Sequence, residues 1–183
     1  MTGTADMGSC TLLDPDEGLE SAVRDWLLTA AALSEADACT GWRESGIALL
    51  RCGHLFAAVR MPAELVQAAA GTVYSHQVDR YLADALPGSP VFADRTRRRY
   101  YALVSAHAED EVCWKAYESY APILGEGCFL GVPDPALITP CHARSYWCVP
   151  MKGPDVLCSP AAVERLLLHG RHLVAVGEER ADV

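Results

Sequence analysis

Residues 47–71 read IALLRCGHLFAAVRMPAELVQAAAG, and this stretch decides the fold class. Its first half holds two short apolar runs, Ile47–Cys52 and Leu55–Arg60, which are separated by Gly53-His54. Glycine at the first of two central positions suits a tight turn, so the pattern predicts an antiparallel hairpin. The second half predicts a helix over Ala63–Ala70, because a proline precedes this segment and a glycine follows it.

Helical patterns also flank this stretch. Asp14-Pro15 is typical of a helix start, with Asp14 as the N-cap, and apolar residues follow at helical spacing from Leu19 to Leu33. The segment Glu35–Glu44 breaks the spacing, so we expect no helix there. A further helical face spans Val78–Leu86 and ends at a Pro-Gly pair.

The C-terminal half is predicted to be mostly strand. The pattern of Glu109–Tyr120 fits either a helix or a loop. A last helix is expected to begin at Ser159-Pro160 and to be stopped by Gly170. The fold class is therefore α+β: a single domain with a mixed or mainly antiparallel sheet of about six strands and helices packed against it. The later strands are expected at Pro90–Ala93, Tyr100–Val104, Cys128–Val132 and Ser145–Val149. The expected core includes Trp26, Leu27, Val59, Leu65, Val91, Leu103, Leu130 and Val149.

The composition limits the class of protein. The chain has 183 residues, of which 51% are hydrophobic and 21% charged, and this excludes a disordered chain and fits one domain. We expect a flexible arm over residues 1–13, the domain over 14–176 and a frayed tail over 177–183. There is no apolar run of about eighteen residues, which predicts no membrane contact. The acidic N-terminus is unlike a signal peptide, so we expect a cytoplasmic protein whose eight cysteines are reduced.

The net charge of −9 argues against a protein that coats nucleic acid, so a phosphate-binding role needs a local basic patch. One exists at the tip of the second predicted hairpin, where Arg95, Arg97, Arg98 and Arg99 lie within five positions. Guanidinium groups match phosphate oxygens in bidentate fashion. The alternative is a solvated turn whose arginines pair with nearby carboxylates. Strand alternation would also direct Arg98 and Arg99 to opposite faces.

Aromatic residues on the adjacent strands offer a second feature for nucleic-acid binding. Tyr100, Tyr101, Tyr146 and Trp147 have rings on which bases can stack, although at least half of them are expected in the core. We include Tyr101 with the four arginines as the candidate phosphate or nucleic-acid site. No catalytic residue and no cofactor is predicted, because the glycine-rich phosphate motifs and the nucleophile elbow are absent from the sequence.

The cysteines give an alternative hypothesis. No pair has the two-residue spacing of a zinc knuckle or a redox dithiol. The nearest arrangement is Cys141-His142 with Cys148, to which Cys52 and His54 could add ligands. Cys141, His142 and Cys148 are the candidate residues if the protein is an enzyme or a metal-binding protein. A third hypothesis is a module that binds only a partner protein.

An ordered set of short motifs resembles one family. The set runs from about Gly41 to Gly170 and includes Phe56–Pro62, then Arg98-Arg99-Tyr100-Tyr101, then Gly131-Val132-Pro133, then Ser145–Pro150. In this order the chain resembles small actinobacterial proteins related to the bifunctional DNA primase/polymerase domain, of the archaeo-eukaryotic primase type. The resemblance implies the same α+β fold.

The resemblance also implies that catalysis is lost. In active relatives an acidic pair on the strand before the first helix binds the catalytic metals, and a histidine in the later hairpin binds the nucleotide phosphates. Here Arg60 and Met61 occupy the first position, and Arg99-Tyr100-Tyr101 holds no histidine. A cation and a thioether cannot replace carboxylates toward Mg²⁺. We therefore expect a non-catalytic binding or regulatory module, whose ligand is a nucleotide, single-stranded DNA or a partner protein.

Overall fold

A computed structural model describes residues 15–140 and 143–181. Within these ranges the chain forms five α-helices and seven strands, arranged as one α+β domain with two antiparallel sheets. The predicted fold class is thus confirmed. The predicted arm over residues 1–13 lies outside the described residues. None of the described helices is long and apolar enough to span a bilayer.

The larger sheet has five strands in the order β5-β2-β4-β3-β7, and every neighbouring pair is antiparallel. The predicted second hairpin is confirmed as β3 and β4, which pair from Val91 opposite Ala102 to Asp94 opposite Arg99. Strand β2 runs directly into a helix, as the proline and glycine signals predicted. The five strands are β2 (Phe56–Pro62), β3 (Val91–Asp94), β4 (Arg99–Ser105), β5 (Ile123–Leu124) and β7 (Ser145–Val149).

The predicted first hairpin is wrong, although both of its strands exist. β1 (Ile47–Arg51) pairs with β6 (Phe129–Pro133) in a separate two-stranded sheet, whereas β2 pairs with β4 and β5. The amide of Gly53 donates to the Phe56 carbonyl and closes a turn, with the glycine at φ +88°. A Cβ on Gly53 would come within 2.3 Å of the Glu126 backbone. The glycine therefore allows a close chain crossing as well as the turn, and the two strands diverge from it.

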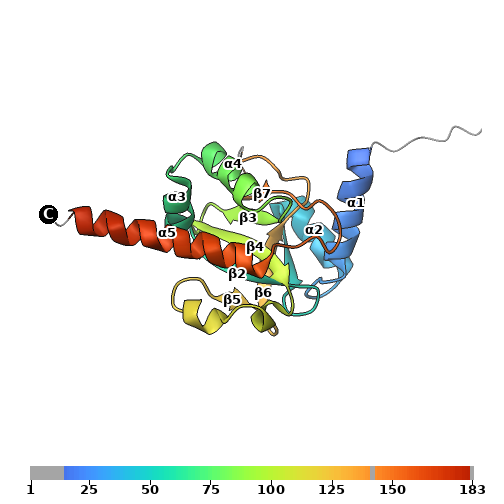
Figure 1. Cartoon of the computed structure of the whole chain (residues 1–183). Coiled ribbons are helices and arrows are strands. Elements are labelled where there is room, and N and C mark those ends of the chain that lie inside the picture. The colour runs from blue at the N-terminus through green and yellow to red at the C-terminus, as the bar shows by residue number, and fades with distance from the viewer. Residues whose placement is uncertain (1–14, 141–142, 182–183) are drawn as a thin grey trace, which may run out of the picture.

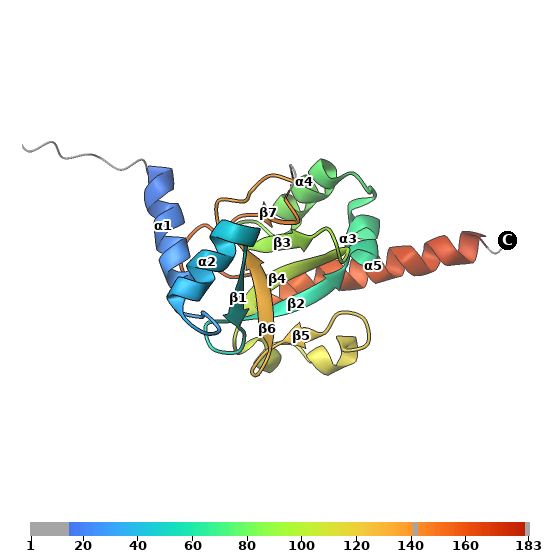
Figure 2. The same cartoon turned by 180° about the vertical axis from the view of Figure 1, so that it is seen from behind.

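The helices cover both faces of the five-stranded sheet (Figures 1 and 2). On one face, α3, α4 and α5 pack against residues of β2, β4 and β7 and enclose the first core. On the other face, α1, α2 and the β1–β6 pair enclose the second core. The helices are α1 (Pro15–Leu28), α2 (Glu35–Ser45), α3 (Ala63–Ala70), α4 (Ser75–Ala85) and α5 (Pro160–Ala181).

Seven of the eight predicted core residues are buried, from Leu27 to Val149. Trp26 is the exception: it is half-buried at the edge of the second core, where its ring lies 6.2 Å from that of Phe56. The ambiguous segment Glu109–Tyr120 forms two short 3₁₀ turns, Ala108–Asp110 and Trp114–Tyr117.

Two helix boundaries differ from the prediction. The first helix ends at Leu28, and a separate helix, α2, occupies the segment that was expected to be irregular. The Ser34 hydroxyl caps α2 by accepting from the Asp37 amide. The last helix continues past Gly170 to Ala181 and so includes most of the expected tail. A Cβ on Gly170 would come within 2.2 Å of the Leu65 carbonyl oxygen. This glycine permits close packing of α5 on α3 and does not end the helix.

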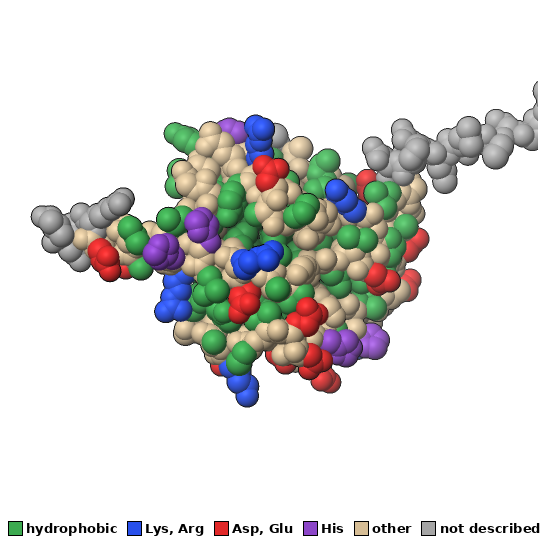
Figure 3. Space-filling view, in the orientation of Figure 1, with side chains coloured by type: hydrophobic (Ala, Val, Ile, Leu, Met, Phe, Trp, Pro, Cys, Tyr) green, Lys and Arg blue, Asp and Glu red, His purple; other side chains and the backbone are tan. Residues whose placement is uncertain are grey.

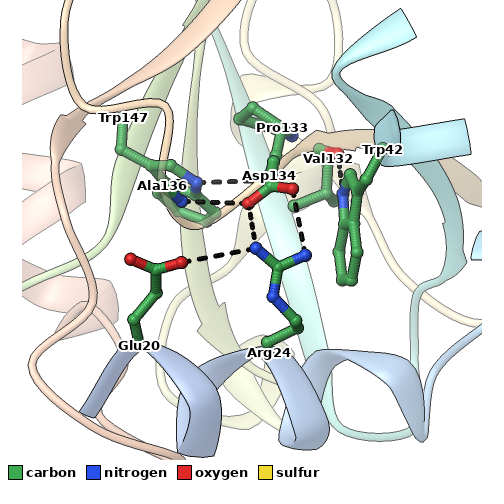
Figure 4. Close-up of polar contacts among 8 residues, drawn as sticks. All are labelled: Glu20, Arg24, Trp42, Val132, Pro133, Asp134, Ala136 and Trp147. Atoms are coloured by element: carbon green, nitrogen blue, oxygen red, sulfur yellow. Dashed lines mark hydrogen bonds and ion pairs between the residues drawn. The ribbon is translucent and has the colours of Figure 1, made fainter. Parts of the chain in front are cut away.

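An ion pair joins helix α1 to the loop after β6 (Figure 4). The Arg24 guanidinium donates to both carboxylate oxygens of Asp134, at 3.0 and 2.6 Å, and to exposed Glu20 at 3.3 Å. Its Cζ also lies 5.2 Å from the centre of the Trp42 ring. Asp134 accepts in addition from the Ala136 amide, so the loop after β6 and helix α1 are held in one arrangement.

Candidate functional site

The tip of the β3–β4 hairpin carries the arginine cluster, and three contacts fix its shape. The Asp94 carboxylate accepts from the Arg97 amide at 3.1 Å, which closes the turn, and Arg98 adopts the left-handed conformation with φ +51°. The Arg98 carbonyl accepts from the amide of Ala63, the first residue of α3, at 3.0 Å. The amide of Arg95 donates to the Arg144 carbonyl at 3.1 Å. The tip is thus joined to α3 on one side and to the start of β7 on the other.

A groove lies beside this tip. Its wide part, about 880 Å³, runs along α3 and the loop between α3 and α4, and Arg98 also lines it. A narrower part of about 150 Å³ continues under the hairpin tip. Ala63, Gln67 and Arg98 line both parts, so the two spaces adjoin, and we call them together the arginine groove. The narrow part is also lined by Ser75, Ala93, Asp94, Arg95, Arg99, Tyr100 and Tyr146.

The arginines of the groove are free to meet an anion. Within the described residues, the only ion pairs closer than 4.0 Å are those of Arg24, so neither Arg95 nor Arg98 is neutralised by a carboxylate. Both residues are exposed, and one Arg95 nitrogen donates to the Pro140 carbonyl at 2.6 Å, which orients that guanidinium without cancelling its charge. The alternative of a turn whose arginines pair with nearby acids therefore has no support in this geometry.

The start of α4 adds to the positive potential. Ser75 is its first residue and lines the narrow part of the groove. The helix has no side-chain cap and no acidic residue in its first turn, and the free amides of a helix N-terminus carry a partial positive charge. An anion between Arg98 and Ser75 would meet both the guanidinium and these amides.

Several arginines belong to one end of the sheet; Figure 1 shows this end as the place where β2 runs into α3. Arg60, the four hairpin arginines and Arg144 all belong to it, which makes six of the thirteen arginines in the sequence. On the face that carries α5, by contrast, Figure 3 shows Lys and Arg side chains scattered among acidic ones. Six arginines thus lie at this end of the sheet in a chain of net charge −9, and Glu64 and Asp94 also line the groove.

Tyr146, which lines the narrow part of the groove, belongs to a polar cluster with Asp79 and Cys148. The Tyr146 hydroxyl donates to the Asp79 carboxylate, with oxygen–oxygen distances of 3.0 and 3.1 Å, and Cys148 lies beside them. Burial raises the pKa of Tyr146, and the nearby Cys148 and Asp79 raise it further. Burial also raises the pKa of the Cys148 thiol well above its usual value. A thiol held protonated is a poor nucleophile and a poor metal ligand.

The opposite face of the hairpin packs into the second core. Tyr101 is buried there with its ring stacked on Phe92, the centroids 4.9 Å apart. Burial and Asp94 raise the pKa of Tyr101, while the positive charges of Arg60, Arg99 and Arg97 oppose this rise. Arg60 is half-buried, and its Nε has no hydrogen-bond partner in the described residues.

The structure therefore brings together only part of the predicted site. Arg95, Arg98 and Arg99 line the groove, whereas Arg97 does not, and Tyr101 lies in the second core. All four aromatic side chains considered for base stacking are buried. The sequence analysis missed Gln67, Ser75 and exposed Tyr74, which come from the α3–α4 region. Nothing in their local sequence marks them, because only the tertiary packing of α3 beside the hairpin brings them to the arginines.

The cysteine hypothesis receives no geometric support from the described residues. Cys141 and His142 lie outside them. Cys52 is in the second core and Cys148 packs against the first, so the five-stranded sheet separates them. Burial, with a smaller effect of Cys128, raises the pKa of the Cys52 thiol to about 12. In the part of the chain that is described, no three His, Cys, Asp or Glu residues are grouped as metal ligands.

Comparisons with protein-family models, with curated proteins and with solved structures give no match.

Proposed function

We propose that this protein is a non-catalytic binding module for a nucleotide, whose phosphates are held in the arginine groove. One observation carries the proposal: Arg95 and Arg98 line a single groove and have no carboxylate partner within the described residues. The uncapped start of α4 lies at the same place. Oriented guanidinium groups together with helix amides are a common arrangement for phosphate oxygens.

The wide part of the groove favours a ligand larger than free phosphate. Its volume of about 880 Å³ falls within the range of small-molecule sites. Tyr74 and Val73 line this part, and both side chains are largely exposed, at 65% and 69%. An exposed aromatic ring and an arginine that line the same space fit a flat base joined to a phosphate group.

The proposed absence of catalysis rests on Arg60 and Met61. Both lie at the end of β2, directly before α3, which corresponds to the place where the resembled primase/polymerase domain carries its acidic pair. Met61 is fully buried in the first core, and Arg60 places a positive charge at the same strand end. A regulatory role in an actinobacterial primase/polymerase-like protein is consistent with this replacement. All six cysteines that the structure describes are free thiols, which fits the proposed cytoplasmic location.

Calorimetric titration of the whole chain with ATP tests the proposal. At about 50 mM salt, where charge attraction is weakly screened, we expect ATP to bind and the affinity to fall as salt is added. Arg95→Ala with Arg98→Ala should weaken binding by at least about tenfold, because each charge-assisted hydrogen bond contributes about 1.5–3 kcal/mol.

A matched control separates the groove from the overall charge. Arg43→Ala with Lys115→Ala removes two exposed positive charges away from the groove, and it should change the affinity by less than about threefold. Equal losses in the two double variants, or no ATP binding by the natural chain, would overturn the proposal. An oligothymidylate that binds while ATP does not would replace the nucleotide by a single strand as the ligand. Nucleotide incorporation with Mg²⁺ or Mn²⁺ would refute the absence of catalysis.

A further inference from the structure

The outer edge of β6 has unpaired backbone groups. On β1, the Arg51 amide donates to the Ala30 carbonyl at 2.7 Å, and the Leu49 carbonyl accepts from Ala32 at 3.0 Å. The backbone groups of residues 49 and 51 therefore point away from β6, and those of Ala48 and Leu50 point toward it. Their register partners on β6 are residues 132 and 130.

It follows that Phe129 and Gly131 direct their N–H and C=O groups to the outer side of β6. The bond from the Cys52 amide to the Cys128 carbonyl, at 3.0 Å, continues the same alternation. None of the four outward groups of Phe129 and Gly131 has a hydrogen-bond partner in the described residues. Figure 2 shows β1 and β6 as a separate pair in front of the larger sheet. A two-stranded sheet with an open edge is a template for further pairing.

The side chains of this small sheet are suited to such pairing. Leu130 and Val132 point inward and are buried, whereas Phe129 on the outer face is 56% exposed and Leu49 is 53% exposed. Gly131, the register partner of Leu49, leaves a place without a side chain on that outer face. Residues 127–133 carry no charge at all in a chain of net charge −9.

The larger sheet, by comparison, protects its edges. Its edge strand β5 has only two residues, and at the other edge the Trp147 amide of β7 donates to the Leu137 carbonyl at 2.7 Å. Natural sheets use short edge strands, coverage or charged side chains to prevent association. At Phe129 and Gly131 the edge of β6 has none of these features, and only its end is covered, where the Pro133 carbonyl accepts from the Trp147 indole at 3.2 Å.

We propose that β6 pairs antiparallel with β6 of a second copy of this chain, centred on Leu130, to give a four-stranded sheet across the two copies. Phe129 then lies opposite the partner's Gly131 and Gly131 opposite the partner's Phe129. Both pairs exchange hydrogen bonds in both directions, so the outward groups of Phe129 and Gly131 on the two edges are all used.

The side chains complement one another in the same register. The Phe129 ring covers the partner's Gly131, which has no side chain, and extends toward the partner's Leu49 on the next strand. An aromatic ring placed over a glycine of a neighbouring strand is a recognised stabilising cross-strand pair. The uncharged stretch is also what a symmetric contact needs, because each charge would approach its own copy. Self-complementarity of this kind favours a second copy over an unrelated peptide.

Sedimentation velocity of the full chain tests the pairing over about a hundredfold range of concentration. We expect the mass to rise from 19.7 kDa to twice that value as concentration increases. Phe129→Pro removes one outward donor and the ring, and edge strands tolerate proline, so this variant should remain folded and monomeric. Phe129→Lys, which places like charges on the two edges, should do the same. Ile138→Lys is the matched control, since Ile138 is also 56% exposed but lies outside β6, and it should still dimerise.

Amide exchange gives a second readout that needs no variant. The amides of Phe129 and Gly131 should exchange more slowly as the natural chain is concentrated, while other exposed amides are unchanged. A natural chain that stays monomeric throughout, or a dimer that survives both Phe129 variants, would overturn the proposal. So would dimerisation without protection of these two amides, or loss of the dimer in Ile138→Lys as well.

Discussion

Substitution of Gly170 by alanine tests whether close packing of α5 on α3 requires a glycine. In an exposed helix interior, replacing glycine by alanine stabilises a protein by about 1 kcal/mol. At Gly170 the added Cβ would lie 2.2 Å from the Leu65 carbonyl oxygen and 2.9 Å from its carbonyl carbon. Both are backbone atoms, so no side-chain rotation can relieve the contact, and the two helices must move apart.

The expected cost follows from the packing around the contact. Overpacking of a well-packed core costs about 1–3 kcal/mol and sometimes more. Leu166 and Leu167, beside Gly170 on α5, are buried in the first core together with Val66 of α3, so separation of the helices also weakens their contacts. We expect the clash to exceed the helical gain and leave a net loss of about 2 kcal/mol in the free energy of unfolding.

Thermal and urea unfolding, followed by circular dichroism, give the measurement. A net loss of about 2 kcal/mol should lower the melting temperature by about 4–8 °C in a domain of this size. Gly177→Ala is the matched control on the same helix, because a Cβ there meets nothing within 4 Å. It should leave stability unchanged or raise it by up to about 1 kcal/mol. Equal stabilisation by the two substitutions would refute the close approach of α5 and α3.

Two further predictions concern stability. Burial raises the pKa of Asp79 although Cys148, Tyr146 and His76 oppose the rise, so the native state holds the proton more tightly than the unfolded chain does. The free energy of unfolding should therefore fall as pH increases from the ordinary aspartate range through the raised pKa. Asp79→Asn should remove this part of the pH profile in urea unfolding. An unchanged profile would contradict the assignment to Asp79. Asp134→Ala removes both bonds from Arg24 and should cost about 1–3 kcal/mol in urea unfolding. Glu20→Gln, which affects only the exposed partner of Arg24, should cost about 0–1 kcal/mol, and equal losses would show that the Arg24–Asp134 pair does not anchor α1.

The sequence predicted those elements whose ends are marked by local chemistry. Pro62 and Gly71 bound α3 as expected, and Gly71 ends the helix in the left-handed conformation. The polar segment between β3 and β4 formed the predicted hairpin. α2 was missed because its apolar spacing is weak, although Ser34 followed by Asp37 is a capping signal.

Pairing and packing between distant segments were not predictable in the same way. Gly53 and Gly170 were interpreted as a hairpin turn and a helix end, which are the common local roles of glycine. Both positions accommodate another backbone, that of Glu126 and that of Leu65; Gly53 also closes a turn, whereas Gly170 does not end its helix. The same limit applies to the groove: the arginines were visible in the sequence, but their neighbours Gln67 and Ser75 come from α3 and α4 through tertiary packing.

Chemical-shift mapping by NMR with ATP tests the central claim most directly, because it reports where the ligand binds. The arginine groove predicts shifts in the amides of residues 63–75 and 95–99, saturating together with one affinity, and no shifts at the separate groove beside α1 that Leu19 and Ile138 line. Shifts confined to that second groove, or an unchanged spectrum at millimolar ATP, would contradict the assignment of the arginine groove as a nucleotide-binding site.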